Sequence, residues 1–170
     1  MLSIYSLKTG KKIEDVPLDI GSIDSMDGKK KSNDIYFRFV SFLNPGIIYQ
    51  TVYDGNQGSG SFKTSVVRET KLDGFNRADF VVKQEFYTNP KDGTKVPMFI
   101  THPKNLPMDG NNPVYLYGYG GFSISLSPFF SPLWVSAMQS FGAVFAVANI
   151  RGGAEQVAKS NRYVHNEIVF

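Results

Sequence analysis

The sequence of 170 residues has no cysteine, two histidines and one tryptophan. Without cysteine, the chain has no disulfide framework, no thiolate zinc site and no cysteine nucleophile. The histidines, His102 and His165, lie far apart along the chain and do not form the spaced ligand cluster of a metal site. The sequence therefore predicts no metal ion and no cofactor. A chain without cysteine is also typical of a reducing compartment, and we expect a cytoplasmic protein.

Long apolar runs and a charge excess of one sign are also absent. No run approaches the roughly 20 apolar residues that span a bilayer, and the first residues lack the basic and apolar regions of a secretory signal. Eighteen Lys and Arg residues against 15 Asp and Glu residues give a net charge of +3. The basic residues are scattered, apart from one short lysine run at residues 29–31. We therefore expect neither a membrane nor a nucleic acid as a partner.

Apolar and aromatic residues are plentiful, at 42% hydrophobic residues with 14 Phe and 9 Tyr. This composition is sufficient for a packed core. In the first half, short β-branched and aromatic runs alternate with glycine and proline turns, which is typical of strands in a meander. The predicted elements are a hairpin over residues 4–16, strands over residues 35–42 and 47–53 joined by a turn at residues 44–46, and an edge strand over residues 65–70.

The polar stretches of this half are expected to lie in turns at the surface. They include a glycine-rich loop at residues 54–61 and two acidic groups, Glu14 with Asp15 and Asp24 with Asp27. Hydrolysis by a pair of carboxylates would need these groups to meet in space, which the sequence does not indicate.

The second half predicts a mixed sheet with a helical crossover. Residues 80–87 and 96–100 predict a hairpin with an Asp-Gly turn. Residues 114–117 form a short apolar run of the kind buried in parallel sheets, and a helix over residues 131–140 and a strand over residues 143–148 follow. The tail from residue 154 to residue 170 predicts a helix with loosely spaced apolar positions.

The glycine-rich segment at residues 118–123 does not fit a dinucleotide-binding fingerprint. That fingerprint needs glycine at its sixth place, where this chain has Ser123, and the rings of Tyr119 and Phe122 would obstruct a pyrophosphate. A turn that simply lets the chain bend after a strand is the alternative. No serine lies in a Gly-x-Ser-x-Gly sequence, and His102, between Thr101 and Pro103, is expected to be a structural or solvated imidazole.

Four segments in order along the chain resemble landmarks of the prolyl oligopeptidase family. They are LNPGIIY at residues 43–49, KDGTKVPMFI at residues 91–100, YGYGGF at residues 117–122 and ANIRGG at residues 148–153. The resemblance implies a mixed β and α/β fold, with the terminal part of a β-propeller over residues 1–72 and the N-terminal part of an α/β-hydrolase domain over residues 73–170. An intact member of this family is a serine peptidase that cleaves short proline-containing peptides after proline.

The resemblance also implies roles for two residues of the third segment. Tyr119 matches the tyrosine whose hydroxyl helps to hold the oxyanion, and Phe122 matches a phenylalanine that lines the pocket for the substrate's proline. Both roles suit the side chains, because a phenol donates to a developing oxyanion and an aromatic wall suits a pyrrolidine ring. The alternative is that both aromatic residues only pack the turn.

The chain departs from the family from about residue 156, after Arg151, Gly152 and Gly153. The family's nucleophilic serine, aspartate and histidine lie beyond this point, so the resemblance implies an internal fragment that is inactive alone. A second hypothesis is a non-catalytic module that associates with other subunits through exposed sheet edges. A third, an intact small enzyme with another mechanism, would require a site that the sequence does not display.

Overall fold

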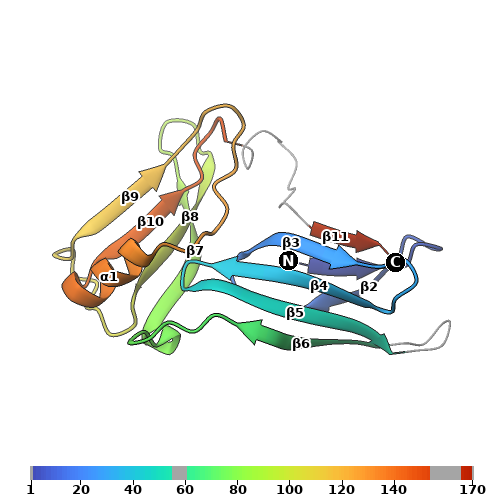
Figure 1. Ribbon diagram of the computed structural model, residues 1–170. Coiled ribbons are helices and arrows are strands. Elements are labelled where there is room, and N and C mark those ends of the chain that lie inside the picture. The colour runs from blue at the N-terminus through green and yellow to red at the C-terminus, as the bar shows by residue number, and fades with distance from the viewer. Residues whose placement is uncertain (1, 55–60, 154–165, 170) are drawn as a thin grey trace.

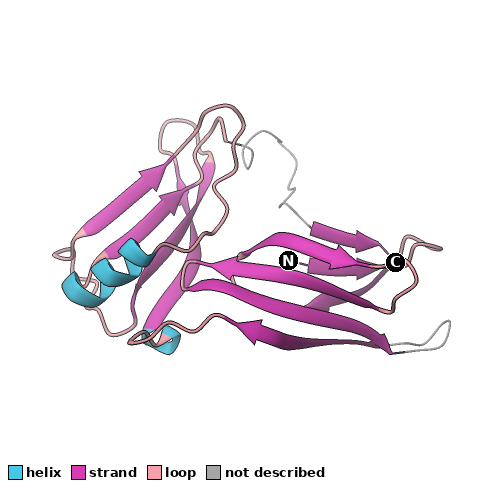
Figure 2. Cartoon of the chain, in the orientation of Figure 1, coloured by secondary structure: helices cyan, strands magenta, loops and turns pink. Residues whose placement is uncertain are grey.

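The computed structural model describes residues 2–54, 61–153 and 166–169, and it divides their strands among three sheets (Figures 1 and 2). In chain order the elements are β1 (Leu2–Tyr5), β2 (Lys12–Val16), β3 (Ser22–Gly28), β4 (Asp34–Ser41), β5 (Asn44–Asp54), β6 (Ser61–Glu69), η1 (Arg77–Asp79), β7 (Phe80–Thr88), β8 (Lys95–Pro103), β9 (Val114–Gly118), α1 (Pro132–Phe141), β10 (Val144–Ala148) and β11 (Asn166–Val169). Figure 1 shows β7 to β10 with α1 on one side of the molecule and the remaining strands on the other.

Strands β3, β4, β5 and β6 form an antiparallel meander in that order, which confirms the predicted meander. The predicted turn at residues 44–46 was wrong by two residues, because Phe42 and Leu43 form the turn and Asn44 already begins β5. The Asn44 side chain accepts a hydrogen bond from the Gly46 amide at 2.8 Å and donates one to Glu69 at 2.6 Å. Asn44 therefore ties the start of β5 to the end of β6.

The acidic residues of this half lie in strands, which corrects their predicted place in turns. Asp24 and Asp27 belong to β3, and Glu14 and Asp15 belong to β2. Both strands are at the edge of their sheets, where one side of the backbone faces water and polar side chains are tolerated. Asp24 forms an ion pair with Arg38 of the neighbouring strand β4.

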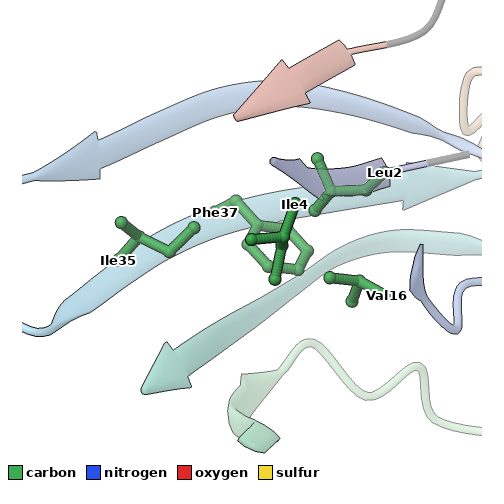
Figure 3. Packing of buried hydrophobic residues seen from close by; sticks show 5 residues of the cluster. All are labelled: Leu2, Ile4, Val16, Ile35 and Phe37. Carbon is green, nitrogen blue, oxygen red and sulfur yellow. The ribbon is translucent and has the colours of Figure 1, made fainter. Parts of the chain in front are cut away.

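The predicted N-terminal hairpin is confirmed as β1 and β2, and Gly10 takes a left-handed conformation in its turn. This hairpin packs on the meander through a core of five buried apolar residues, drawn in Figure 3: Leu2, Ile4, Val16, Ile35 and Phe37. Strand β11 pairs with β1 in parallel, so residues 166–169 are a strand and not part of the predicted helix. The rest of that predicted helix falls outside the described residues, as does most of the predicted loop at residues 54–61.

The third sheet has the strand order β7-β8-β10-β9 and confirms both predictions for the second half. Strands β7 and β8 form the hairpin around Asp92 and Gly93, and β9 and β10 are parallel neighbours joined through α1. Ser131 caps the start of α1 by accepting a hydrogen bond from the Trp134 amide, and Gly142 ends the helix in a left-handed conformation. These local signals explain why the helix limits were predictable.

The two parallel strands differ in burial. Strand β10 lies between β8 and β9, and all its residues are buried. Strand β9 was expected to be buried, but Val114 is 63% exposed and Leu116 is 64% exposed. Strand β9 is an edge strand of this sheet, with a described neighbour on one side only, whereas β10 has a neighbour on each side.

Two further features concern the described residues as a whole. Nowhere in that part of the chain is a helix both long and apolar enough to cross a membrane. The same residues hold no group of three His, Asp or Glu side chains placed to bind a metal ion.

Candidate functional site

The segments that follow β9 and β10 meet at the carboxyl ends of these parallel strands. Ligand sites of sheets with parallel strands usually form outside that edge. The first segment, residues 118–123, contains Tyr119 and Phe122, and the second is residues 149–153. The Ser123 amide donates a hydrogen bond to the Gly152 carbonyl at 3.0 Å, which joins the two segments.

The two segments touch backbone to backbone at a pair of glycines. A Cβ atom on Gly120 would overlap the Arg151 carbonyl oxygen, and a Cβ atom on Gly152 would overlap the Gly120 carbonyl oxygen. Gly152 also has a φ of 90°, which other residues rarely adopt. Only glycine at both positions therefore permits this approach.

The Tyr119 phenol folds back over Gly121. A Cβ atom on Gly121 would lie 2.9 Å from the Tyr119 hydroxyl oxygen and 3.0 Å from the ring carbon that bears it. The residue is 37% exposed, so the phenol lies against the turn without being enclosed. Gly121 thus leaves the space that the phenol occupies.

Phe122 points away from the protein and is 92% exposed. Phe122 and Ser123 have φ angles of 54° and 53°, so two successive residues other than glycine are left-handed. Such residues cost about 1–3 kcal/mol each and persist where the surrounding structure holds them. Here the Ser123 amide is bonded to Gly152 and the Ile124 amide to the Gly121 carbonyl at 3.1 Å. The turn is therefore held in a conformation that displays an aromatic ring.

An ion pair joins the second segment to the β7–β8 hairpin. The Arg151 guanidinium bonds to the Asp92 carboxylate, which also accepts a hydrogen bond from the Thr94 amide at 3.1 Å. Both interactions favour the charged carboxylate, and Arg151, the larger influence, lowers the pKa of Asp92 below its ordinary value. The pair is solvent-exposed, so it orients the segment more than it stabilises the fold.

Asn149, at the end of β10, links three elements and was not singled out by the sequence. Its amide donates to the Pro97 carbonyl at 2.9 Å, and its side chain donates to the Leu126 carbonyl at 3.1 Å. The side chain is buried, and its carbonyl oxygen has no hydrogen-bond partner among the described residues. The sequence signal was present, since Asn149 lies within the ANIRGG segment.

Of the two histidines, only His102 falls within the described residues. It is buried on β8, and its Nδ1 lies 2.8 Å from the Pro103 carbonyl oxygen. A ring nitrogen bonded to the backbone is typical of a structural imidazole, as the sequence predicted. His165 lies outside the described residues.

A substitution at Gly121 tests whether the turn holds the Tyr119 phenol. In Gly121→Ala the new methyl group should displace the ring while the backbone stays in place, and the free energy of unfolding should change by no more than about 1 kcal/mol. The rate of Tyr119 nitration, mapped by mass spectrometry, should rise. Gly118→Ala is the control, because its Cβ would approach the Ala148 carbonyl oxygen and not the phenol. Equal nitration rates in Gly121→Ala and the unsubstituted chain would contradict this contact.

Comparison with known proteins identifies relatives along most of the chain. The N-terminal β-propeller domain of prolyl oligopeptidase, as a sequence family, matches residues 1–60. Prolyl oligopeptidase ophP of Omphalotus olearius is 38% identical over 154 residues, which cover 91% of this chain and 20% of that protein. The dual function macrocyclase-peptidase POPB of Amanita bisporigera is 41% identical over 152 residues, which cover 89% of this chain and 20% of that protein.

The fold is similar as well. The structure of prolyl oligopeptidase B from Galerina marginata bound to a 35mer hydrolysis and macrocyclization substrate matches 88% of this chain with a TM-score of 0.75 and 35% sequence identity. The matched region is 20% of that structure's chain. The chain therefore spans about a fifth of the length of the relatives that it matches. The roles of Tyr119 and Phe122 stay predictions.

Proposed function

We propose that the chain, which is similar to prolyl oligopeptidases along most of its length, belongs to that family and represents part of a serine peptidase that hydrolyses short peptides after proline. Residues 1–72 would be the last part of its β-propeller, and residues 73–170 would begin its α/β-hydrolase domain. No cofactor is needed for this chemistry, and the proposed location is the cytoplasm.

The observation that carries the proposal is the pair of aromatic side chains at the carboxyl end of β9. The Tyr119 side chain is 37% exposed and lies against Gly121, so its hydroxyl is available to donate a hydrogen bond to charge that develops on a substrate carbonyl oxygen. A donor that the turn orients before the reaction would need little reorganisation as the charge forms. Tyr119 is accordingly the proposed catalytic residue of this chain.

Phe122 is the proposed wall of the proline pocket. A fully displayed ring in a constrained turn is available to contact the apolar face of a pyrrolidine ring. In the chain alone this ring contacts mainly water, which agrees with a pocket whose other walls belong to parts that this chain does not include.

The remaining catalytic groups are proposed to lie outside this chain. Its sequence has no Gly-x-Ser-x-Gly segment for an activated serine. Without a nucleophile and its base, an oxyanion donor and one wall of a substrate pocket give only a small fraction of the full rate enhancement. The isolated chain is therefore expected to be inactive.

A chimaera tests the function directly. Residues 1–153 would replace the matching region of the Galerina marginata prolyl oligopeptidase B, and the product would be assayed on a glycyl-prolyl reporter amide. The chimaera should cleave the reporter, and Tyr119→Phe in it should lower kcat about tenfold or more with little change in KM, because one oxyanion donor is lost. The isolated chain is the control, which should neither cleave the reporter nor react with a fluorophosphonate.

Three results would contradict parts of the proposal. A chimaera that folds, as judged by circular dichroism, and leaves the reporter intact would contradict the function. A kcat unaffected by Tyr119→Phe would contradict the role of Tyr119 alone. Fluorophosphonate labelling of a serine in the isolated chain, lost in His102→Ala or His165→Ala, would instead reveal a triad within this chain.

The edge strand β9 favours a second candidate function, that of a non-catalytic module which associates through its sheet edge. No described strand pairs with the outer side of β9, and its apolar side chains are exposed. Unpaired backbone beside apolar side chains is a template for pairing with another chain. A second copy of this chain or a longer subunit of the same family would fit this edge.

A charged substitution on β9 tests whether copies of the chain associate through this strand or through another surface. If the edge pairs, light scattering should show a mass that increases with protein concentration, and Leu116→Lys should return the chain toward a monomer. Leu133→Lys is the control, because Leu133 is an apolar residue of similar exposure that lies on α1 and not on the edge strand. A monomer at all concentrations would contradict this second function.

A further inference from the structure

The turn between β4 and β5 inserts two apolar side chains into the other half of the molecule. Phe42 is only 3% exposed, and Leu43 is also buried. Turns usually lie at the surface and carry polar residues, so a buried apolar pair at this position needs partners from elsewhere. We call residues Phe42 and Leu43 the plug.

The partners of the plug belong to the sheet formed by β7 to β10 and to its helix. The Phe42 ring lies 5.6 Å from Phe99 of β8, 5.9 Å from Phe129 and 6.3 Å from Trp134 of α1, the last with nearly parallel planes at 12°. Leu43 belongs to a buried cluster shared with the helix and the central strand: Val135, Met138, Ala143 and Phe145. The meander is therefore anchored in the core of the other sheet.

One of these partners lies in the segment that contains the candidate site. Residues 119–131 connect β9 to α1, with Tyr119 and Phe122 at their start and Phe129 near their end. The preceding residue, Pro128, accepts a hydrogen bond from the Ser22 hydroxyl of β3 at 3.0 Å. Two separate parts of the meander, β3 and the plug, therefore hold two successive residues of this segment.

We propose that Phe42 is a positioning residue through which the meander sets the conformation of residues 119–131 and thereby the placement of Tyr119 and Phe122. The catalytic roles of Tyr119 and Phe122 rest on the proposed function, whereas the coupling between Phe42 and the segment does not. The physical reason is that the segment is held at several points. Hydrogen bonds to Gly121 and Gly152 hold its start, the Asn149 side chain donates to Leu126 in its middle, and Ser22 and Phe42 hold its end. Loss of the contact at its end should make opening of the segment more frequent.

Hydrogen exchange in the full 170-residue chain tests this coupling at a distance from the plug. The Ser123 and Ile124 amides are hydrogen-bonded in the turn to Gly152 and Gly121, so they report on the conformation at the start of the segment. In Phe42→Ala their exchange should become about tenfold faster, as expected when local opening replaces a closed state. Trp134 is the only tryptophan, and its emission should shift to longer wavelength as its stacked partner is lost.

The control separates coupling from general loss of stability. Phe37→Ala removes a buried ring from the meander without touching the plug, and it should leave the exchange of Ser123 and Ile124 close to that of the unsubstituted chain. Phe42→Leu, which retains apolar volume, should give an intermediate exchange rate. Ser22→Ala, which removes the second attachment, should also accelerate exchange.

The inference is overturned if Phe42→Ala changes exchange only beside the cavity, near Phe99 and Trp134, and leaves Ser123 and Ile124 unchanged. Should Phe42→Ala fail to fold, unchanged exchange of these two amides in both Phe42→Leu and Ser22→Ala would overturn it equally. None of these measurements requires catalysis, so an inactive chimaera would contradict the proposed function and leave this result standing.

Discussion

Replacing Gly152 by alanine should lower the free energy of unfolding by about 3 kcal/mol or more, since strained backbone and steric overlap add at one site. Its φ of 90° is unfavourable for a side chain, and the new Cβ would overlap the Gly120 carbonyl oxygen. The backbone fixes the position of the Cβ atom, and the carbonyl is itself part of the backbone, so neither can rotate aside. The overlap can be relieved only if residues 118–123 separate from residues 149–153, with loss of the Ser123 to Gly152 hydrogen bond.

Gly110→Ala is the matched control for this prediction. Gly110 has nearly the same φ, 87°, but nothing lies within 4 Å of its added Cβ. This variant should therefore show only the conformational cost, about 1–2 kcal/mol. Urea denaturation of both variants measures the difference. Equal losses of stability would mean that residues 118–123 and 149–153 are not in contact.

Phe37→Ala should destabilise the chain by about 3–5 kcal/mol, the usual cost of removing a fully buried aromatic ring. Phe37 lies at the centre of the core between the N-terminal hairpin and the meander, as Figure 3 shows. Its ring also stacks on Tyr49 of β5, with centroids 5.3 Å apart and planes at 19°. Truncation leaves a cavity between two sheets that cannot move together without breaking strand pairing.

The same truncation at the exposed turn provides the comparison. Phe122→Ala should change stability by no more than about 0.5 kcal/mol, because a ring in water contributes little packing. Urea midpoints of the two variants should therefore differ widely. A large loss of stability in Phe122→Ala would show that this ring packs the turn, which would remove the support for its role as a pocket wall.

Elements that depend on neighbouring residues could be predicted from the sequence alone. The turns at Gly10 and at Asp92 with Gly93 depend on backbone conformations that glycine allows, so both hairpins were found. The limits of α1 follow from Ser131 and Gly142, which cap its ends. The family resemblance also depended only on short segments in order, and the comparisons confirmed it.

Features that depend on residues distant in the sequence were decided by the tertiary structure. Strand β3 is polar and was missed, because an edge strand needs no apolar pattern when its partner β4 provides the pairing. The turn at Phe42 and Leu43 was placed too late, because apolar residues predict a strand until another sheet is known to bury them. The exposure of β9 and the burial of β10 likewise depend on what packs against each strand, which no local pattern encodes.

The candidate site, too, could be predicted from the sequence only in part. Its residue types, Tyr119 and Phe122, were recognisable from the sequence, because the glycine-rich segment around them is short and continuous. Its geometry was not, since the close approach of Gly120 to Gly152 joins positions that follow two different strands. Sequence determined which side chains this edge of the sheet carries, and parallel pairing of β9 with β10 decided that they meet, because it places both carboxyl ends side by side.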